Sequence, residues 1–305
     1  MIKIVFMGTP DYATCILQKI LKAEFMVPLL ITQPDKPIGR KQILTPPHIK
    51  NWVKKNDLDI DILQPKTLRE DGIAKKISSY KPDFIIVAAY GQILPKEILE
   101  ICPCINLHAS ILPKFRGASP IQSSILQNDE FTGVTAMLMQ EGMDDGDILA
   151  LSYIKAREKK VDQLFIELSQ IAAKLTLNVI KNFSHLQPIK QNSANASYCV
   201  KIKKTNGLVS FNENASEIYQ KFLAYTPWPG IFLENGLKLK NIELLETISL
   251  NHESGLIKNI KDDSIVVTCK KGSILIYSVQ AASKKEMSCL DYFRGKRLSV
   301  GSKLV

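Results

Sequence analysis

The sequence predicts an α/β domain built on a mostly parallel sheet, followed by a smaller domain that forms a β-barrel. In the first half of the chain, short continuous apolar runs alternate with amphipathic stretches. This alternation is typical of a parallel sheet whose two faces are both covered by helices. In the second half, short apolar runs are separated by turn-forming residues, a pattern typical of a small barrel. A chain of 305 residues is also long enough for about two domains.

The elements of the first half follow from the spacing of the apolar residues. The continuous apolar runs, each predicted to be a strand, cover residues 2–7, 27–32, 83–89, 104–107, 132–140 and 147–155. Between the first two runs, the apolar residues of 12–21 recur at helical spacing. Residues 161–181 form a longer helical pattern with leucine and isoleucine on one face.

Residues 183–205 change character and mark the boundary between the domains. Pro188 and many Asn, Ser and Gln residues give this segment no regular period, and lysines make its end basic. Beyond it, Asn214 is predicted to cap a helix. The strands predicted for the second domain cover residues 231–234, 237–245, 255–260, 265–269 and 274–279. The predicted organisation is a first domain, a basic linker and a second domain, over residues 1–184, 185–205 and 206–305.

Composition and charge exclude several classes of protein. Apolar residues make up 45% of the chain and charged residues 23%, which excludes a mainly disordered or coiled-coil protein. No apolar stretch approaches the roughly 18 residues that a membrane-spanning helix needs, so we expect no membrane association. The six scattered cysteines predict reduced thiols and a cytoplasmic protein. The net charge of +10 favours a polyanionic partner.

Two polar side chains stand at the end of a predicted strand, in Ile-Asn-Leu-His-Ala-Ser-Ile-Leu-Pro over residues 105–113. Asn106 and His108 are two residues apart, so both project to the same face of the strand. Open α/β sheets bind ligands beyond the carboxyl ends of their strands. An imidazole can transfer a proton and an amide can donate to a developing oxyanion. The pair is therefore a catalytic candidate, although the spacing alone also fits an ordinary strand end.

An acidic turn over residues 140–147 is the second segment that carries chemistry. Gly142 and Gly146 allow a sharp turn that can hold one carboxylate inward. A carboxylate beside His108 would favour the protonated imidazole and fix its orientation. The alternatives are a solvated acidic turn or a loop for a divalent ion, and the spacing does not match a calcium-binding loop.

Other kinds of site have little support. The first turn contains Gly8 but lacks the further glycines of a dinucleotide-binding loop, and Pro10 removes a backbone N–H there. Four histidines without a C-x-x-C pair predict no zinc site, so we expect no metal. A G-x-S-x-G nucleophile turn is absent too.

In their order and spacing, these segments resemble the folate-dependent formyltransferase superfamily. The segments that carry the resemblance are residues 7–11, 32–37, 89–95, 106–113, 116–120, 142–147, 227–229 and 284–297. They extend over essentially the whole chain. Within the superfamily they are most similar to the branch that formylates methionyl-tRNA.

The resemblance implies a Rossmann-like catalytic domain joined to an OB-type barrel that binds tRNA. The donor would be 10-formyltetrahydrofolate, and the acceptor would be the α-amino group of methionine on initiator tRNA, for translation initiation. The matched catalytic positions are Asn106, His108 and Asp144. The matched folate-binding positions are Ser110, Ile111, Leu112 and Pro113.

The substrate amine is itself the nucleophile, so the enzyme must stabilise an oxyanion and move a proton. Asn106 and His108 can supply the oxyanion donors, and Asp144 can orient His108 or a water that relays the proton. We expect a monomer.

A basic, proline-rich loop over residues 33–48 is expected, by the same resemblance, to reach the acceptor end of the tRNA. Lys36, Arg40 and Lys41 are its candidate contacts. The family usually has Gly-Arg-Gly where this chain has Gly39-Arg40-Lys41. In the linker, the candidate contacts to tRNA are Lys201, Lys203 and Lys204.

Two alternatives share these residues. A formyltransferase acting on a small amine, such as an amino-sugar nucleotide or glycinamide ribonucleotide, would use the same catalytic set. It would not need a barrel, a basic linker or the basic tail of residues 284–303. A non-catalytic RNA-binding protein on the same scaffold would not need the intact catalytic set.

Overall fold

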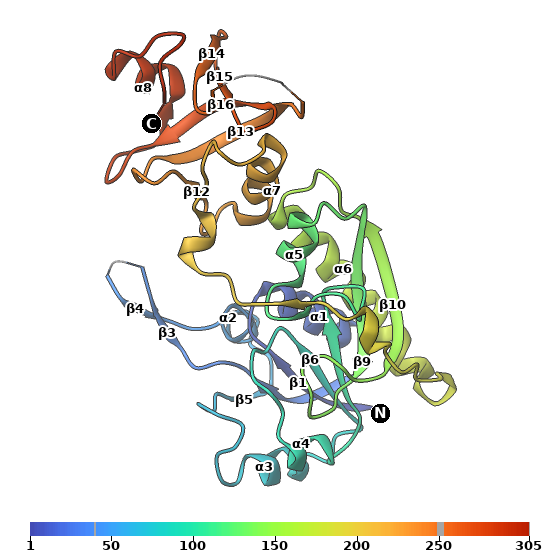
Figure 1. Ribbon diagram of the computed structural model, residues 1–305. Helices are drawn as coiled ribbons and strands as arrows, with labels where there is room; N and C mark the ends of the chain where they lie inside the picture. Colours follow the sequence, from blue (N-terminus) through green and yellow to red (C-terminus); the bar gives the residue numbers. More distant parts are fainter. Residues whose placement is uncertain (40, 249–252, 305) are drawn as a thin grey trace. The chain divides into compact units, whose positions relative to one another are not determined.

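The computed structural model describes residues 1–39, 41–248 and 253–304 (Figure 1). Its residues form two compact units. Unit 1 consists of Met1–Ile121, Glu130–Lys155 and Gln163–Val200, and unit 2 consists of Gln122–Asp129, Ala156–Asp162 and Lys201–Val305. The change to unit 2 after Val200 falls inside the segment predicted to be a linker.

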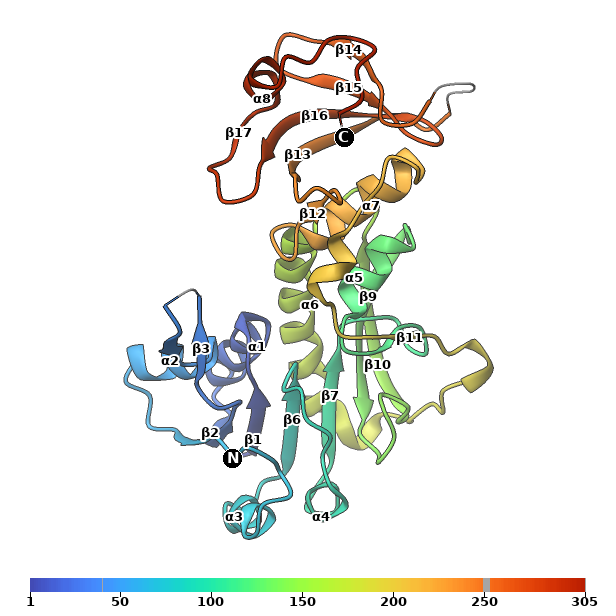
Figure 2. The ribbon, with the colours of Figure 1, turned by 60° about the vertical axis from the view of Figure 1, so that its left-hand side comes forward.

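Unit 1 contains a seven-stranded sheet with the order β10-β9-β7-β6-β1-β2-β5. Its strands are β1 (Lys3–Gly8), β2 (Met26–Ile31), β5 (Asp61–Leu63), β6 (Phe84–Ala88), β7 (Cys104–His108), β9 (Phe131–Leu138) and β10 (Ile148–Lys155). The five strands from β7 to β5 in this order are parallel, and β9 is antiparallel to both β7 and β10 (Figure 2). The predicted fold class, a mostly parallel α/β domain followed by a small β domain, is confirmed.

Both faces of the central strands β1, β6 and β7 are largely buried, as the continuous apolar runs predict, whereas the edge strand β10 alternates with exposed residues. The helices of the first 182 residues are α1 (Asp11–Lys22), α2 (His48–Lys55), α3 (Ile73–Ser79), α4 (Lys96–Leu99), α5 (Pro120–Leu126) and α6 (Val161–Asn182). Val5 and Met7 of β1 belong to one core cluster with Ile73 and Ile77 of α3. Elsewhere, Tyr12 of α1 packs edge-on against Phe165 of α6 and donates a hydrogen bond to the carbonyl of Leu107 in β7.

Several short elements of unit 1 were not predicted. β3 (Lys36–Ile38) and β4 (Ile43–Thr45) form a hairpin within the basic loop. β8 (Arg116–Gly117) pairs in parallel with β11 (Tyr198–Cys199), which lies in the segment predicted to be a linker. Local periodicity could not reveal β11, because its two residues are held by a partner far away in the sequence.

Unit 2 contains an antiparallel sheet with the order β12-β13-β16-β15-β14, and β17 pairs with β16. Its strands are β12 (Ile231–Phe232), β13 (Lys238–Glu246), β14 (Ile257–Ile260), β15 (Ile265–Thr268), β16 (Ser273–Gln280) and β17 (Met287–Ser288). The helix α7 (Ala215–Tyr225) begins after Asn214, as predicted, and the Asn214 N–H donates to the Glu217 carboxylate over 3.0 Å. The last helix, α8 (Cys289–Gly295), was missed because seven residues carry too little periodicity. Across the described ranges, the structure contains no helix that is long and apolar enough to span a membrane.

Candidate functional site

The strand β7 places Asn106 and His108 beside the acidic turn. Asn106 is half-buried, and His108 is only 6% exposed. The Asn106 Nδ2 donates to Oδ1 of Asp144 over 3.2 Å, and Nδ1 of His108 lies 3.5 Å from Oδ2 of Asp144. The structure therefore brings together the three residues that the sequence matched to a catalytic set.

The carboxylate of Asp144 is the centre of this cluster. Its Oδ2 also accepts the backbone N–H of Gly117 over 2.8 Å, and its side chain is 16% exposed. A carboxylate with one amide donor, one backbone donor and an imidazole around it is held in a single orientation. The carboxylate is nevertheless not fully buried, so solvent or a ligand can reach it.

Backbone geometry turns Asp144 inward. Asp144 has a φ of 50°, in the left-handed region. A Cβ on Gly146 would lie 1.7 Å from the carbonyl oxygen of Leu138, so only glycine permits this close approach. The carbonyls of Asp144 and Gly146 both accept from Nε2 of Gln191, over 2.9 and 2.7 Å. The neighbouring Asp145 is not part of this arrangement, a distinction that spacing alone could not make.

The hydrogen-bond partner of Nε2, the other ring nitrogen of His108, determines which nitrogen of the imidazole carries the hydrogen. Its Nε2 lies 2.8 Å from the carbonyl oxygen of Phe115. A carbonyl oxygen only accepts, so Nε2 must carry the hydrogen. The remaining nitrogen, Nδ1, faces Asp144. A proton on Nδ1 would therefore lie between this nitrogen and the carboxylate of Asp144.

Two further residues, Gln191 and Arg116, support the Asp144 turn. The sequence analysis did not predict this supporting role for either of them. The Arg116 Nε and Nη2 donate to Oε1 of Gln191 over 3.1 and 2.8 Å, and both side chains are buried. Together they tie the Asp144 turn to the loop after β7. Gln191 lies in a segment without period, so no local signal pointed to it.

Gly117 is predicted to tolerate no side chain. It has a φ of 118°, and an added Cβ would lie 2.2 Å from the carbonyl oxygen of Cys199. We expect Gly117→Ala to lower the free energy of unfolding by at least about 2 kcal/mol, measured by denaturant unfolding. Gly295→Ala, where a Cβ would meet no atom within 4 Å, is the control and should change it little. Equal stability of the two variants would contradict this account of the loop.

The segment predicted to bind folate, Ser110 to Pro113, follows β7 directly. Ser110 is fully buried, and its hydroxyl donates to the carbonyl of Lys114 over 2.6 Å. The buried Leu112 donates its N–H to Oγ1 of Thr135 over 3.1 Å. Ile111 and Pro113 are half-buried. The polar groups of Ser110 and the N–H of Leu112 are thus used to hold the loop.

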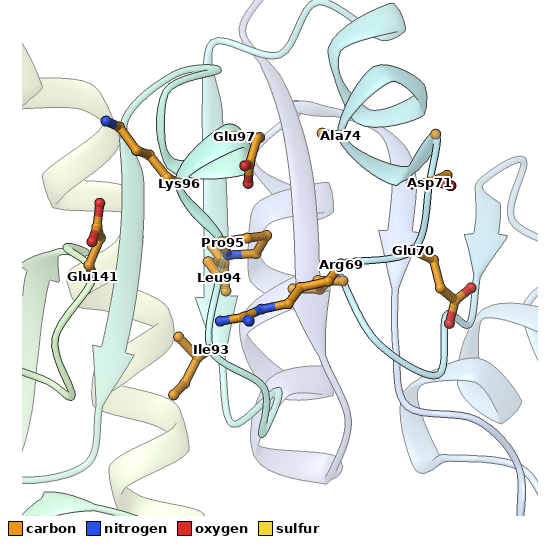
Figure 3. Close-up of a pocket in the computed structure, with 12 residues that line it drawn as sticks. Arg69, Glu70, Asp71, Ala74, Ile93, Leu94, Pro95, Lys96, Glu97 and Glu141 are labelled. Carbon is orange, nitrogen blue, oxygen red and sulfur yellow. The ribbon is translucent and has the colours of Figure 1, made fainter.

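A cavity of about 600 Å³ lies among residues 68–74, residues 93–97 and Glu141 (Figure 3). Leu94 and Pro95 form an apolar part of the cavity wall, and the Arg69 side chain extends toward Ile93 in this view. Two loops meet here because the backbone N–H of Leu68 donates to the side chain of Gln92 over 3.0 Å. Glu141 is three residues before Asp144, so one turn contributes both to the cavity and to the cluster of Asn106, His108 and Asp144. Sequence reasoning did not find this cavity.

The strand that carries Asn106 and His108 also carries a thiol. Burial, followed by the nearby Cys102, raises the pKa of the Cys104 thiol to about 12. Cys104 is therefore neutral at pH 7 and is not a thiolate nucleophile. In the part of the chain that the structure describes, no three His, Cys, Asp or Glu side chains are grouped as metal ligands.

The residues predicted to bind tRNA lie in two segments. Lys36 begins β3, Lys41 follows it in the hairpin, and both are exposed. Arg40 lies outside the described residues. In the second segment, Lys201, Lys203 and Lys204 are exposed directly after unit 1 ends.

Comparisons with known proteins identify relatives of this chain and of its fold. The family model "Formyl transferase" matches residues 2–178, and "Formyl transferase, C-terminal domain" matches residues 201–297. The chain is 54% identical over 300 residues to the methionyl-tRNA formyltransferase of a Nitratiruptor species, covering 98% of each chain. Among solved structures, it is similar to a sugar 3N-formyl transferase, WlaRD, with a TM-score of 0.66 and 20% identity, over 93% of this chain and 99% of that one. It is also similar to the methionyl-tRNA formyltransferase from Clostridium thermocellum, with a TM-score of 0.57 and 18% identity, over 91% and 100%.

Proposed function

Since the chain belongs to the methionyl-tRNA formyltransferase family, we propose that it transfers the formyl group of 10-formyltetrahydrofolate to the α-amino group of methionine on initiator tRNA. The observation that carries the proposal is the meeting of Asn106, His108 and Asp144 at one place. The amine attacks the formyl carbon, the bond from that carbon to N10 of the folate breaks, and one proton moves from the amine to N10. The chain must supply oxyanion stabilisation and a path for that proton.

Asn106 supplies the oxyanion donor. His108, predicted to be a second donor, has Nε2 directed at the Phe115 carbonyl and Nδ1 directed at Asp144, so both of its ring nitrogens are already used. An amide nitrogen has two N–H bonds, and one of those of Asn106 points to Asp144. The other can donate to the oxygen of the formyl group as negative charge develops on it. Since the Asp144 bond fixes the amide before the substrate arrives, the donor needs no rearrangement during reaction.

His108 and Asp144 form the proton relay. The carbonyl of Phe115 holds the hydrogen on Nε2, so a second proton on His108 can only reside on Nδ1, facing Asp144. Asp144 takes the proton of the attacking amine, directly or through a water, and returns it to N10 of the folate as the bond from N10 to the formyl carbon breaks. The Nδ1 atom of His108 faces Asp144 and can share this proton while it is in transit.

The cavity beside Glu141 holds the folate. Its volume of about 600 Å³ suits a ligand of this size. The apolar residues Leu94 and Pro95 can pack on the planar pterin ring, and Glu141 can accept from its N–H groups. Arg69 can pair with the carboxylates of the glutamate tail. Ser110 to Pro113, which the resemblance matched to folate binding, are not among the residues that line this cavity.

We expect Arg69→Ala to raise the KM for 10-formyltetrahydrofolate by about 2–5-fold without changing kcat, because an exposed ion pair contributes about 0.2–1 kcal/mol. Lys66→Ala, on the same loop but outside the cavity lining, is the control. Steady-state kinetics with the folate varied at saturating tRNA makes the comparison. An unchanged KM in Arg69→Ala would mean that the glutamate tail of the folate does not bind at Arg69.

Unit 2 and the basic segments bind the tRNA. The catalytic domain (1–184) supplies Lys36, Arg40 and Lys41 of the basic loop (33–48), and the linker (185–205) supplies its three lysines. Exposed lysines contact phosphates without reading sequence. The OB-like domain (206–305) supplies the remaining surface.

Replacing Lys201, Lys203 and Lys204 together with alanine should weaken tRNA binding and flatten its salt dependence. Each lost phosphate contact lowers the slope of log K against log salt by about 0.7–0.9, so the slope should fall by about 2–3. A variant with Lys75, Lys174 and Lys181 replaced by alanine removes the same charge from exposed positions of α3 and α6. Equal slopes in the two variants, measured by filter binding at several salt concentrations, would mean that the linker does not contact phosphates.

The enzyme acts as a monomer in the cytoplasm. The assay that tests the function compares formyl transfer to charged initiator tRNA, charged elongator tRNA, free methionine and a nucleotide-linked amino sugar. Transfer to initiator methionyl-tRNA alone supports the proposal. Transfer to the amino sugar and not to tRNA would replace it with the small-amine alternative.

A further inference from the structure

The segment that leads out of unit 1 runs along the loop that holds His108. The backbone N–H of Arg116 donates to the carbonyl of Ser197 over 2.8 Å, and the N–H of Ala118 donates to the carbonyl of Cys199 over 3.1 Å. These bonds make the short parallel pair of β8 and β11. The pairing also brings the side chains of Ser197 and Cys199 against Phe115.

The two peptide groups that flank Phe115 are hydrogen-bonded at all four polar positions. Before Phe115, the carbonyl of Lys114 accepts from the Ser110 hydroxyl over 2.6 Å, and the Phe115 N–H donates to Oγ of Ser197 over 2.9 Å. After it, the Phe115 carbonyl accepts from Nε2 of His108 over 2.8 Å and from Sγ of Cys199 over 3.3 Å. The remaining N–H, that of Arg116, donates to the Ser197 carbonyl. Ser197 therefore holds both peptide groups, one with its hydroxyl and one with its carbonyl.

Phe115 needs this support because its backbone is in an unfavourable conformation. It has a φ of 60°, which places a bulky residue in the left-handed region, and it is 8% exposed. Such a conformation persists only where the surroundings hold it. A shift of this residue would move the carbonyl oxygen that receives the Nε2 hydrogen of His108.

We propose that Ser197 is a positioning residue, which fixes the imidazole of His108 by holding the peptide groups of Phe115. The inference rests on the proposed catalytic role of His108. Ser197 contributes no group to the reaction. Its hydroxyl accepts the Phe115 N–H and its backbone carbonyl accepts the Arg116 N–H, so Phe115 is held on both sides. The Phe115 carbonyl then holds Nε2–H of His108, and Nδ1 is thereby directed at Asp144. The linker segment is thus part of the catalytic arrangement as well as a connection to unit 2.

The test compares Ser197→Ala with Ser197→Thr, which keeps a hydroxyl, and with Ser193→Ala, an exposed serine of the same segment. Ser197→Ala should lower kcat about tenfold, because small misplacement of a catalytic group is costly, and should leave the KM for tRNA and folate unchanged. In ¹⁵N-histidine spectra, the Nε2–H signal of His108, assigned by its loss in His108→Ala, should shift. Ser197→Thr should restore both readouts, and Ser193→Ala should alter neither.

An unchanged kcat or an unchanged imidazole signal in Ser197→Ala would overturn the proposal. If Ser197→Ala does not fold, amide exchange in the unaltered protein decides the matter. The Phe115 N–H should then exchange as slowly as that of Leu112, and fast exchange would contradict its bond to Ser197. The spectra and exchange do not depend on turnover, so they separate this inference from the proposed function. An active His108→Ala would refute the role of His108 and with it the effect of Ser197 on kcat, and the imidazole signal would remain the test of positioning.

Discussion

Replacing His108 with alanine is expected to lower the turnover of formyl transfer by about 10²–10⁴-fold while leaving folate binding intact. His108 is 6% exposed and lies between the Phe115 carbonyl and the Asp144 carboxylate. In the proposed mechanism, its removal eliminates the imidazole that shares a proton with Asp144. The cavity assigned to the folate is lined by other residues, so affinity for the folate should persist.

Single-turnover kinetics and calorimetric binding of tetrahydrofolate measure the two quantities separately. His185→Ala is the control, because His185 is exposed on a short helical turn after α6. Turnover near that of the unaltered enzyme in His108→Ala would remove the imidazole from the mechanism. Loss of folate affinity together with turnover would mean that His108 shapes the cavity instead.

The second large effect is expected from Asp144→Asn, which should lower turnover by about 10²-fold or more. The substitution keeps one oxygen, which can accept the Gly117 N–H, but its amide nitrogen cannot accept from Nδ2 of Asn106. It also removes the negative charge that faces Nδ1 of His108 and the carboxylate proposed to take the substrate proton. The loss therefore measures the charge and the second acceptor oxygen, because the shape of the side chain is kept.

Asp145→Asn is the matched control, because it makes the same change one residue away. Among the described residues, Oδ1 of Asp145 is buried without a hydrogen-bond partner, and its carboxylate lies beside Gly142. The Asn106 amide and the His108 imidazole are paired with Asp144 instead. Turnover in Asp145→Asn should stay within about threefold of the unaltered enzyme. Equal losses in the two variants, or the reverse order, would show that the wrong carboxylate has been assigned.

The sequence alone was sufficient to locate the helices and strands that depend on a local pattern of apolar residues. The strands β1, β6 and β7 are continuous apolar runs, and α6 shows a helical period over 22 residues, so periodicity located them. The spacing of Asn106 and His108 also predicted that they share a face. These features depend on residues that are close in the chain.

The features that sequence reasoning missed depend on contacts between distant segments. Gln191 and Ser197 lie in a stretch without period, yet both hold parts of the site through bonds to residues more than 40 positions away. The cavity forms where residues 68–74 meet residues 93–97 and Glu141. The chemistry of a side chain does not reveal which distant backbone group the side chain will contact. No pattern in these segments therefore pointed to the roles of Gln191 and Ser197 or to the cavity.

A crystal structure with 5-formyltetrahydrofolate, a folate that retains the formyl group without donating it from N10, tests the central claim most directly. The account predicts that the pterin occupies the cavity beside Glu141 and that N10 lies about 3–4 Å from the Asn106 amide and the Asp144 carboxylate. A folate bound with N10 far from both groups, or bound outside this cavity, would contradict it.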